Sequence, residues 1–273
     1  MALKNLTDSQ FEKFTTLIYS TLGVYLNESK RATLDIKLIK IIKKYHPEIG
    51  SIDEYYDCLN DPKKYPYIWE KFVDNITVHK TDFFRENDHY EYLKDNIGKI
   101  LEEIPSIKQK KEIRVWCAAA STGEEPYTTA MVLNEILPSD ISIKFLATDI
   151  SEDVLVKASK GLYKSTSLDD VDEGLKSKYF RHVTGGYEAK DSLKSLITFR
   201  KLNLNDPFIF KYKFDIIFCR NVMIYFDEGM KKKVVEKMYD ALNDNGIFII
   251  GLSETISDRN TKFALLRASM YKK

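Results

Sequence analysis

Residues 113–127 read IRVWCAAASTGEEPY, and this stretch decides the fold. It begins with a short apolar run typical of a buried β-strand, continues through small residues to Gly123, and enters a helix led by Glu124 and Glu125. Strand, small-residue turn and helix form the opening unit of a nucleotide-binding α/β domain. Small side chains let the backbone approach a bulky ligand, and the helix N-terminus offers free N–H groups to it.

The two carboxylates at this helix N-terminus favour one kind of ligand. Glu124 and Glu125 already place negative charge at the positive end of the helix dipole, so they would repel a pyrophosphate. A cofactor with a cationic end fits better, and S-adenosylmethionine carries both an ammonium and a sulfonium group. The alternative interpretation is an ordinary tight turn followed by a capped helix.

Composition bounds the class of protein. The 273 residues are enough for one large domain or two smaller ones, and the net charge of +1 gives no global attraction to nucleic acid. The three cysteines form no CxxC pair and the four histidines show no metal-ligand spacing, which predicts a reducing cytoplasm and no metal site. No apolar run is long enough to cross a bilayer, so we expect a cytoplasmic protein that is not inserted in a membrane.

The first 75 or so residues have helical patterns only. Apolar periodicity and capping residues predict helices over 3–22, 30–45, 51–60 and 67–76. Since no parallel-strand pattern precedes residue 113, we expect a helical domain at 1–76 and a second domain at 77–273.

The second predicted helix has a basic face. This face carries Lys30, Lys37, Lys40 and Lys44, opposite the apolar side chains of the same helix. One interpretation is a solvated helix face, and the other is a docking face for an acidic partner.

The rest of the chain alternates between strands and helices. Strand patterns at 113–117, 143–148, 214–219 and 247–251 predict a mostly parallel, doubly wound sheet, closed by an antiparallel hairpin at 263–267 and 270–272. Residues 162–200 break the alternation. Gly185-Gly186 lies there between short runs, which predicts a small antiparallel β-subdomain at about 178–200.

Several polar residues follow strand ends, where open α/β sheets bind ligands. Asp149 ends the second strand, where an acid accepts ribose hydroxyls, although it also precedes a helix-capping Ser. Asn203 follows the third strand, and Arg220, Asn221 and Tyr225 follow the fourth. The linker segment TDFFR (81–85) either fixes the linker to the core or brings Arg85 to the edge of an active site.

At this point the chain resembles the CheR-type chemotaxis receptor methyltransferases. The resemblance rests on TDFFR (81–85), RVWCAAASTGEEPY (114–127), ATDIS (147–151), NL (203–204) and FDIIFCRNVMIYF (214–226), in the family's order and spacing. Two positions depart from the family's pattern. His79 stands where Asn is common, and Gly185-Gly186 replaces the Gly-x-Gly turn of members that bind a receptor's C-terminal pentapeptide.

The resemblance implies a class I S-adenosylmethionine-dependent methyltransferase domain behind a helical domain. It also implies methyl transfer to glutamate side chains on the cytoplasmic helices of chemoreceptors, with S-adenosylhomocysteine as product, by a monomeric enzyme. Carried over by motif, the residues that border or bind the cofactor are Thr81, Arg85, Glu124, Asp149, Asn203, Leu204, Arg220 and Asn221. Arg85 and Tyr225 would face the reacting groups, and the docking interpretation of Lys37, Lys40 and Lys44 gains weight.

Two other functions compete with this reading. A class I methyltransferase of nucleic acid or of a small molecule shares the fold, but the fourth strand ends in Arg-Asn-Val-Met rather than the Asn-Pro-Pro-Tyr of amino-directed DNA methyltransferases. A non-catalytic cofactor sensor or receptor adaptor is the second alternative. The presence of both Arg85 and Tyr225 disfavours it.

Overall fold

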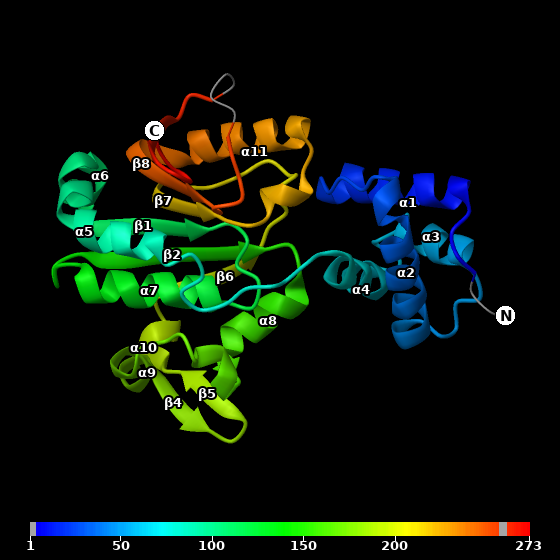
Figure 1. The fold of residues 1–273 in the computed structure, drawn as a ribbon, viewed down its shortest axis with the longest axis horizontal. Helices are drawn as coiled ribbons and strands as arrows, with labels where there is room; N and C mark the ends of the chain where they lie inside the picture. Colours follow the sequence, from blue (N-terminus) through cyan, green and yellow to red (C-terminus); the bar gives the residue numbers. More distant parts are fainter. Residues whose placement is uncertain (1–3, 257–260) are drawn as a thin grey trace. The chain divides into compact units, whose positions relative to one another are not determined.

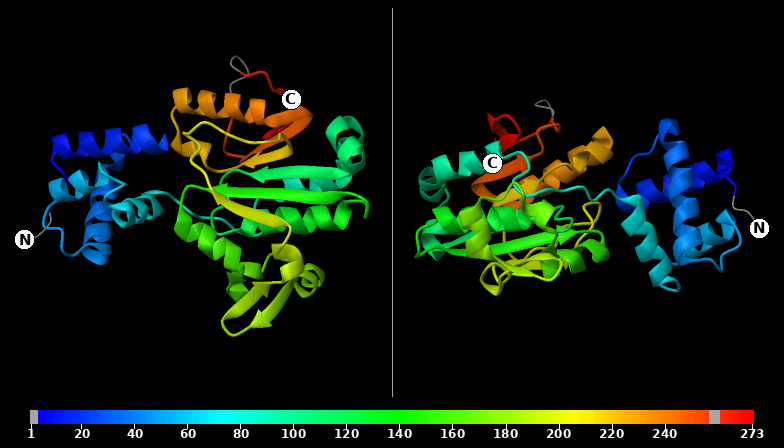
Figure 2. Two further views of the ribbon diagram at one scale, coloured as in Figure 1. Left: turned by 180° about the vertical axis from the view of Figure 1, so that it is seen from behind. Right: turned by 60° about the horizontal axis from the view of Figure 1, so that its bottom comes forward.

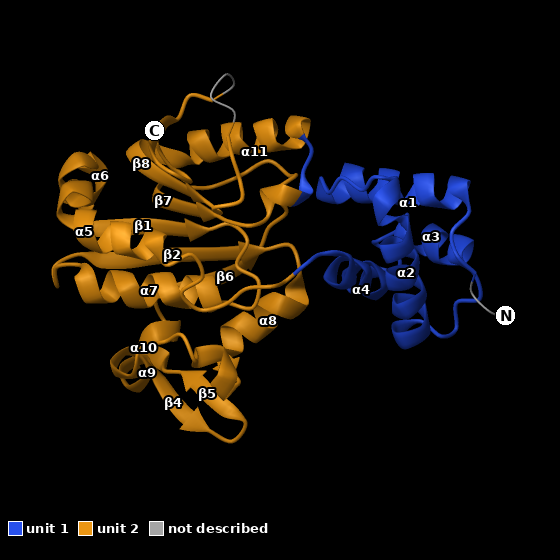
Figure 3. Ribbon diagram, viewed as in Figure 1, with its two compact units in different colours: residues 1–78, 225–227 blue, residues 79–224, 228–273 orange. Residues whose placement is uncertain are grey.

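The chain forms two compact units in a computed structural model that describes residues 4–256 and 261–273. Unit 1 comprises Met1–Val78 and Tyr225–Asp227, and unit 2 comprises His79–Ile224 and Glu228–Lys273 (Figure 3). Each unit is described below by itself.

Unit 1 is helical. Its α-helices are α1 (Asp8–Leu22), α2 (Arg31–Tyr45), α3 (Ile52–Leu59) and α4 (Pro66–Ile76), with a short 3-10 turn η1 (Glu28–Lys30) before α2 (Figure 1). The helix expected from residue 3 begins at Asp8, because the Thr7 side chain accepts the backbone N–H of Gln10 and completes a capping box there. Gly23 ends α1 at a φ of 73°, a left-handed conformation that glycine adopts without strain.

The core of unit 1 lies between α2 and its neighbours. Leu34, Leu38 and Ile41 of α2 are buried, as the helical pattern predicts, together with Phe14 and Phe72 from α1 and α4. A short piece of distant chain completes the unit. Val24 forms an antiparallel bridge with Phe226, and the Tyr25 N–H donates to the Tyr225 carbonyl at 2.9 Å.

Unit 2 is built on a seven-stranded sheet with the order β6-β2-β1-β7-β8-β10-β9. Strands β1, β2, β6, β7 and β8 are parallel, while β10 lies antiparallel between β8 and β9. This arrangement confirms the predicted mostly parallel sheet with antiparallel C-terminal strands. The bounds are β1 (Glu112–Cys117), β2 (Ser142–Asp149), β6 (Ile197–Lys201), β7 (Phe214–Cys219), β8 (Leu242–Ile250), β9 (Ala264–Arg267) and β10 (Met270–Lys272).

Both faces of this sheet are covered, and Figure 2 gives two further views of the layers. Val115 and Cys117 of β1 point into the main core, which also takes side chains from α5 (Asp88–Glu103), α6 (Pro105–Lys110) and α7 (Glu124–Ile136). Trp116 points to the other face, where Phe208 and Phe210 pack edge-on against its ring. The remaining helices are α8 (Glu152–Lys160) and α11 (Glu228–Ala241).

A second, three-stranded antiparallel sheet has the order β3-β5-β4, with β3 (Leu162–Tyr163), β4 (Phe180–Val183) and β5 (Gly186–Ala189). The helices α9 (Glu173–Tyr179) and α10 (Asp191–Lys194) flank it. Gly186 has a φ of 144°, and a Cβ there would lie 2.0 Å from the Tyr163 carbonyl oxygen. The expected antiparallel subdomain is therefore present. However, Ile197–Lys201 pairs with β2 at the edge of the main sheet, and Leu162–Tyr163 joins the small sheet instead.

The amino end of β7 is fixed by one buried carboxylate. Asp215 accepts hydrogen bonds from the Ser106 hydroxyl at 2.6 Å, the Asn243 side-chain amide at 2.8 Å and the backbone N–H of Arg114 at 2.8 Å. These contacts join α6, β1 and β8 at the end of the sheet opposite to Arg220, which follows the carboxyl end of the same strand.

Candidate functional site at the carboxyl edge of the main sheet

The turn after β1 is tightly folded. The Ala120 N–H donates to the Thr148 carbonyl at 2.8 Å, which holds the turn against β2. Gly123 precedes α7 with a φ of 100°, and a Cβ there would lie 2.7 Å from the Tyr163 hydroxyl and 2.9 Å from the Ala158 Cβ. Only glycine fits this conformation and this space. The Ser121 hydroxyl donates to the His79 carbonyl at 2.8 Å, a main-chain contact that does not depend on the side chain at position 79.

Asp149 ends β2 beside this turn. Its carboxylate accepts the Ser121 N–H at 2.8 Å and the Ser151 N–H at 3.1 Å, so it connects the two loops. Burial raises the pKa of Asp149, and the backbone hydrogen bonds only partly oppose that effect. An ionised carboxylate offers about four acceptor positions, more than these two hydrogen bonds occupy, so Asp149 keeps capacity to accept a ligand hydroxyl.

Glu124 is the first residue of α7 and is 8% exposed. The Thr122 hydroxyl donates to its carboxylate at 2.6 Å, and burial raises its pKa. Among residues 4–256 and 261–273, no lysine, arginine or histidine forms an ion pair with it. A nearly buried carboxylate without a cationic partner is poorly solvated, and a cation would stabilise it.

Asn203 and Leu204 follow β6. The Leu202 N–H donates to the Asp149 carbonyl at 2.9 Å, which places the start of this loop beside the end of β2. Lys237 of α11 donates to the carbonyls of Leu204 and Asp206 and thereby fixes the loop. Sequence patterns do not reveal this role of Lys237, because its partners are backbone oxygens that any residue supplies.

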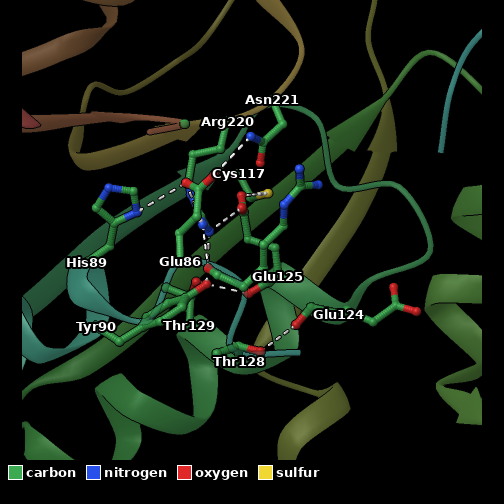
Figure 4. A network of polar contacts seen from close by, with 12 residues as sticks. Glu86, His89, Tyr90, Cys117, Glu124, Glu125, Thr128, Thr129, Arg220 and Asn221 are labelled. Carbon is green, nitrogen blue, oxygen red and sulfur yellow. Dashed lines mark hydrogen bonds and ion pairs between the residues drawn. The ribbon is translucent and has the colours of Figure 1, made fainter. Parts of the chain in front are cut away.

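Arg220 directly follows β7, and its side chain is fully buried. Its guanidinium forms ion pairs with Glu125 at 2.6 Å and Glu86 at 3.1 Å, and it also contacts the Tyr90 hydroxyl and the Arg85 carbonyl (Figure 4). Burial alone would lower the pKa of Arg220, but the two carboxylates outweigh burial and raise it. The guanidinium is therefore held among protein groups, although its buried Nε has no hydrogen-bond partner among the described residues.

Arg85 lies in the loop between unit 2's first residues and α5. Arg85 as a whole is half-buried, and its guanidinium donates to the Lys80 carbonyl at 3.0 Å. Within the part of the chain that the structure describes, no carboxylate forms an ion pair with it. Thr81 begins the same loop and is half-buried. Phe83 packs edge-on against Tyr163 and Phe180, which fixes this loop to the core of unit 2; the delivery of Arg85 to an active site stays a prediction.

Two carboxylates that the sequence analysis missed hold the loop after β7. Glu254 is 6% exposed and accepts the backbone N–H groups of Asn221 at 2.8 Å, Gly251 at 2.7 Å and Ile224 at 3.2 Å. Glu86 accepts the Asn221 side-chain amide at 3.1 Å. The available signals were weak: Glu86 directly follows TDFFR, and Glu254 follows the last parallel strand.

The other predicted residues lie in unit 1. Tyr225 ends a 3-10 turn, η3 (Met223–Tyr225), and pairs through its carbonyl with Tyr25. Lys37 is half-buried and donates to the Ile76 carbonyl at 2.8 Å, at the end of α4, and burial lowers its pKa. Lys30 lies in η1. The exposed basic groove on α2 is lined instead by Ile36, Ile39, Lys40, Lys43 and Lys44.

Comparison with known protein families shows which family this chain belongs to. The model described as "CheR methyltransferase, SAM binding domain" matches residues 79–272, and "CheR methyltransferase, all-alpha domain" matches residues 9–77. The chain belongs to the CheR methyltransferase family. It is 35% identical to a chemotaxis protein methyltransferase of Borreliella burgdorferi, over 98% of this chain and 95% of the relative. It is 32% identical to that of Escherichia coli (strain K12), over 97% and 91%.

This CheR-family chain is thus an S-adenosylmethionine-dependent chemotaxis protein methyltransferase. The residues at the edge fit that cofactor, because no described cation pairs with the carboxylate of Glu124 and the cofactor carries an ammonium. Asp149 retains acceptor capacity for ribose hydroxyls, and the turn before α7 has no room for a side chain at Gly123. The individual residue assignments remain predictions.

Two further observations concern metals and membranes. Within the described ranges, no three acidic, histidine or cysteine side chains gather as a metal site. None of the described helices is long and apolar enough to cross a bilayer.

Proposed function

We propose that this CheR-family enzyme methylates glutamate side chains on the cytoplasmic helices of chemotaxis receptors, forming glutamyl methyl esters. The observation that supports this most is that two opposite charges at one edge of the sheet, Glu124 and Arg85, form no ion pair with any residue that the structure describes. Glu124 offers a carboxylate to the ammonium of the cofactor, and Arg85 offers a guanidinium to an incoming carboxylate. A planar guanidinium suits a carboxylate, with which it forms two parallel hydrogen bonds.

The proposed reaction requires the attacking oxygen to be aligned with the methyl group, and it requires no proton transfer. A glutamate carboxylate is already ionised at neutral pH, so it needs no general base. When bound, the cofactor supplies a methyl group activated by its sulfonium. Arg85 would orient the attacking oxygen, and the role of Tyr225 toward the transferred methyl stays a prediction from the family motif. In this scheme neither residue gains or loses a proton, and Asp149 and Glu124 hold the cofactor in line with the attacking oxygen.

We further propose that the groove on α2 binds the receptor. Lys40, Lys43 and Lys44 are exposed around Ile36 and Ile39, so the groove combines positive charge with apolar surface. Such a surface complements an acidic amphipathic helix. Lys37 is not part of this binding surface, because its ammonium caps α4. The enzyme would act as a monomer in the cytoplasm, where these receptor helices lie.

The chemical type of the methylated bond distinguishes this function from the alternatives. The protein is incubated with receptor-containing membranes and methyl-labelled cofactor, and the labelled receptor is then treated with base. Methyl esters release the label as methanol, whereas methylated amines do not. Label that resists base would point to another methyl acceptor. Cofactor binding without labelling of the receptor would favour a sensor or adaptor.

A further inference from the structure

We propose that Glu86 is a positioning residue for methyl transfer, because its carboxylate ties the segment carrying Arg85 to the carboxyl ends of β7 and β8. This inference rests on the proposed role of Arg85 in orienting the substrate carboxylate.

Three hydrogen-bond donors from two strand ends converge on Glu86, and Figure 4 shows two of these residues, Arg220 and Asn221. One oxygen accepts the Asn221 side-chain amide at 3.1 Å. The other accepts the Arg220 guanidinium at 3.1 Å and the backbone N–H of Leu252 at 3.0 Å. Arg220 and Asn221 follow β7, and Leu252 follows β8. One side chain therefore connects the loop before α5 with both loops at the centre of the site.

The loop around Arg85 needs such a connection, because its backbone is strained on both sides of Arg85. Phe84 has a φ of 54° and Glu86 a φ of 56°, in the left-handed region that disfavours residues with a Cβ. Strained residues persist where surrounding contacts fix them. The Arg85 carbonyl is fixed by the Arg220 guanidinium, which Glu86 itself helps to hold.

The Arg85 side chain depends on this backbone for its place. Within the part of the chain that the structure describes, its guanidinium makes one hydrogen bond, to the Lys80 carbonyl at 3.0 Å, so few polar contacts define its position. When the backbone at Glu86 shifts, the guanidinium shifts with it. A displacement of about 1 Å at a reacting group can cost about 100-fold in rate.

The proposed cofactor contacts would survive the loss of Glu86. Asp149 and Glu124 make no hydrogen bond to it, and the Asn221 backbone stays bound to Glu254. We therefore expect Glu86→Ala to lower kcat/KM for receptor by at least about tenfold while the Kd for S-adenosylhomocysteine changes less than threefold. Glu86→Gln should retain more activity, because the Asn221 amide can turn to accept from the new amide group.

Asp215→Asn is the matched control. Asp215 also binds three donors from neighbouring elements, but at the opposite end of β7. A merely structural role of Glu86 would make both variants lose thermal stability and activity alike. We expect Asp215→Asn to lower Tm with little change in kcat/KM of the protein that remains folded.

A double-mutant cycle with Arg85→Ala provides the decisive test. If Glu86 acts through Arg85, adding Glu86→Ala or Glu86→Gln to Arg85→Ala should cause little further loss of receptor methylation. Full additivity, with Arg85→Ala alone impaired, overturns the role of Glu86 but leaves the proposed function standing. Normal methylation by Arg85→Ala overturns the role of Arg85 and this inference together, while the base-labile label still reports on the function itself.

Discussion

Replacement of Glu124 by Gln should weaken cofactor binding without weakening the fold. The Glu124 carboxylate is buried, its pKa is raised by burial, and no cation pairs with it among the residues described. A neutral isostere keeps the Thr122 hydrogen bond and removes a desolvated charge, so Tm should stay the same or rise. The ligand ammonium, however, loses a charge-assisted hydrogen bond of about 1.5–3 kcal/mol, which corresponds to about 10- to 150-fold in Kd.

The neighbouring Glu125→Gln is the control with the opposite expectation. Its carboxylate is paired with the buried Arg220 at 2.6 Å. Removing one partner of a buried ion pair costs about 3–5 kcal/mol, and we expect about 2 kcal/mol here because Glu86 still faces the guanidinium. For a domain of this size that loss lowers Tm by about 4–8 °C.

Calorimetry with S-adenosylhomocysteine and thermal unfolding measure both effects. An unchanged Kd for Glu124→Gln, or a drop in Tm as large as that of Glu125→Gln, would refute the assignment of Glu124 to the ammonium.

The remaining predictions concern the cofactor, the substrate, the docking groove and pH. Asp149→Ala should raise the Kd for S-adenosylhomocysteine at least about tenfold by calorimetry, since two hydrogen bonds to a charged group are lost; unchanged affinity would remove Asp149 from the site. Arg85→Ala should lower methyl transfer more than cofactor affinity, and equal losses of both would make Arg85 a cofactor ligand. Lys40→Glu with Lys44→Glu should raise the KM for receptor and weaken the dependence of that KM on salt, with cofactor affinity unchanged. A normal KM at low salt would show that these lysines are only solvated and do not bind the receptor. Burial, aided by Arg220, lowers the pKa of His89 from 6.5 to about 4. Between these pH values His89 is protonated in the unfolded chain but neutral in the folded protein. As pH falls from 6.5 to 4, His89 therefore lowers the free energy of unfolding by up to about 3 kcal/mol, and above pH 6.5 it has no such effect. His89→Gln should flatten unfolding free energy against pH in that window, and curves of equal slope would contradict the buried neutral state.

The fold was largely predictable because its signals are local. The pattern of 113–127 identifies the first strand, the turn and α7, and Thr7 and Ser51 cap helices as expected. The strand Leu162–Tyr163 was missed because two residues carry no periodicity, and its pairing with β5 depends on Gly186 and distant backbone.

The site was only partly predictable, because a motif names residues without saying which way they point. Arg220 belongs to the motif, yet its side chain is directed into the core, where Glu125 and Glu86 neutralise it. Lys37 fits the helical spacing of a basic stripe, but its ammonium donates a hydrogen bond to the carbonyl of Ile76. Partners that are distant in sequence decide both cases, and periodicity along one helix does not contain them.

The short piece Tyr225–Asp227 has a consequence for how this protein could be divided or recombined. Because these residues belong to the helical unit, the chain passes between the two units three times, after Val78, after Ile224 and after Asp227. A gene fragment that stops at Val78 would encode the helices without the strand partner of Val24. The helical unit is therefore not a module that evolution or a protein engineer can exchange by one junction. A transplant to another methyltransferase needs the 225–227 segment grafted along with it.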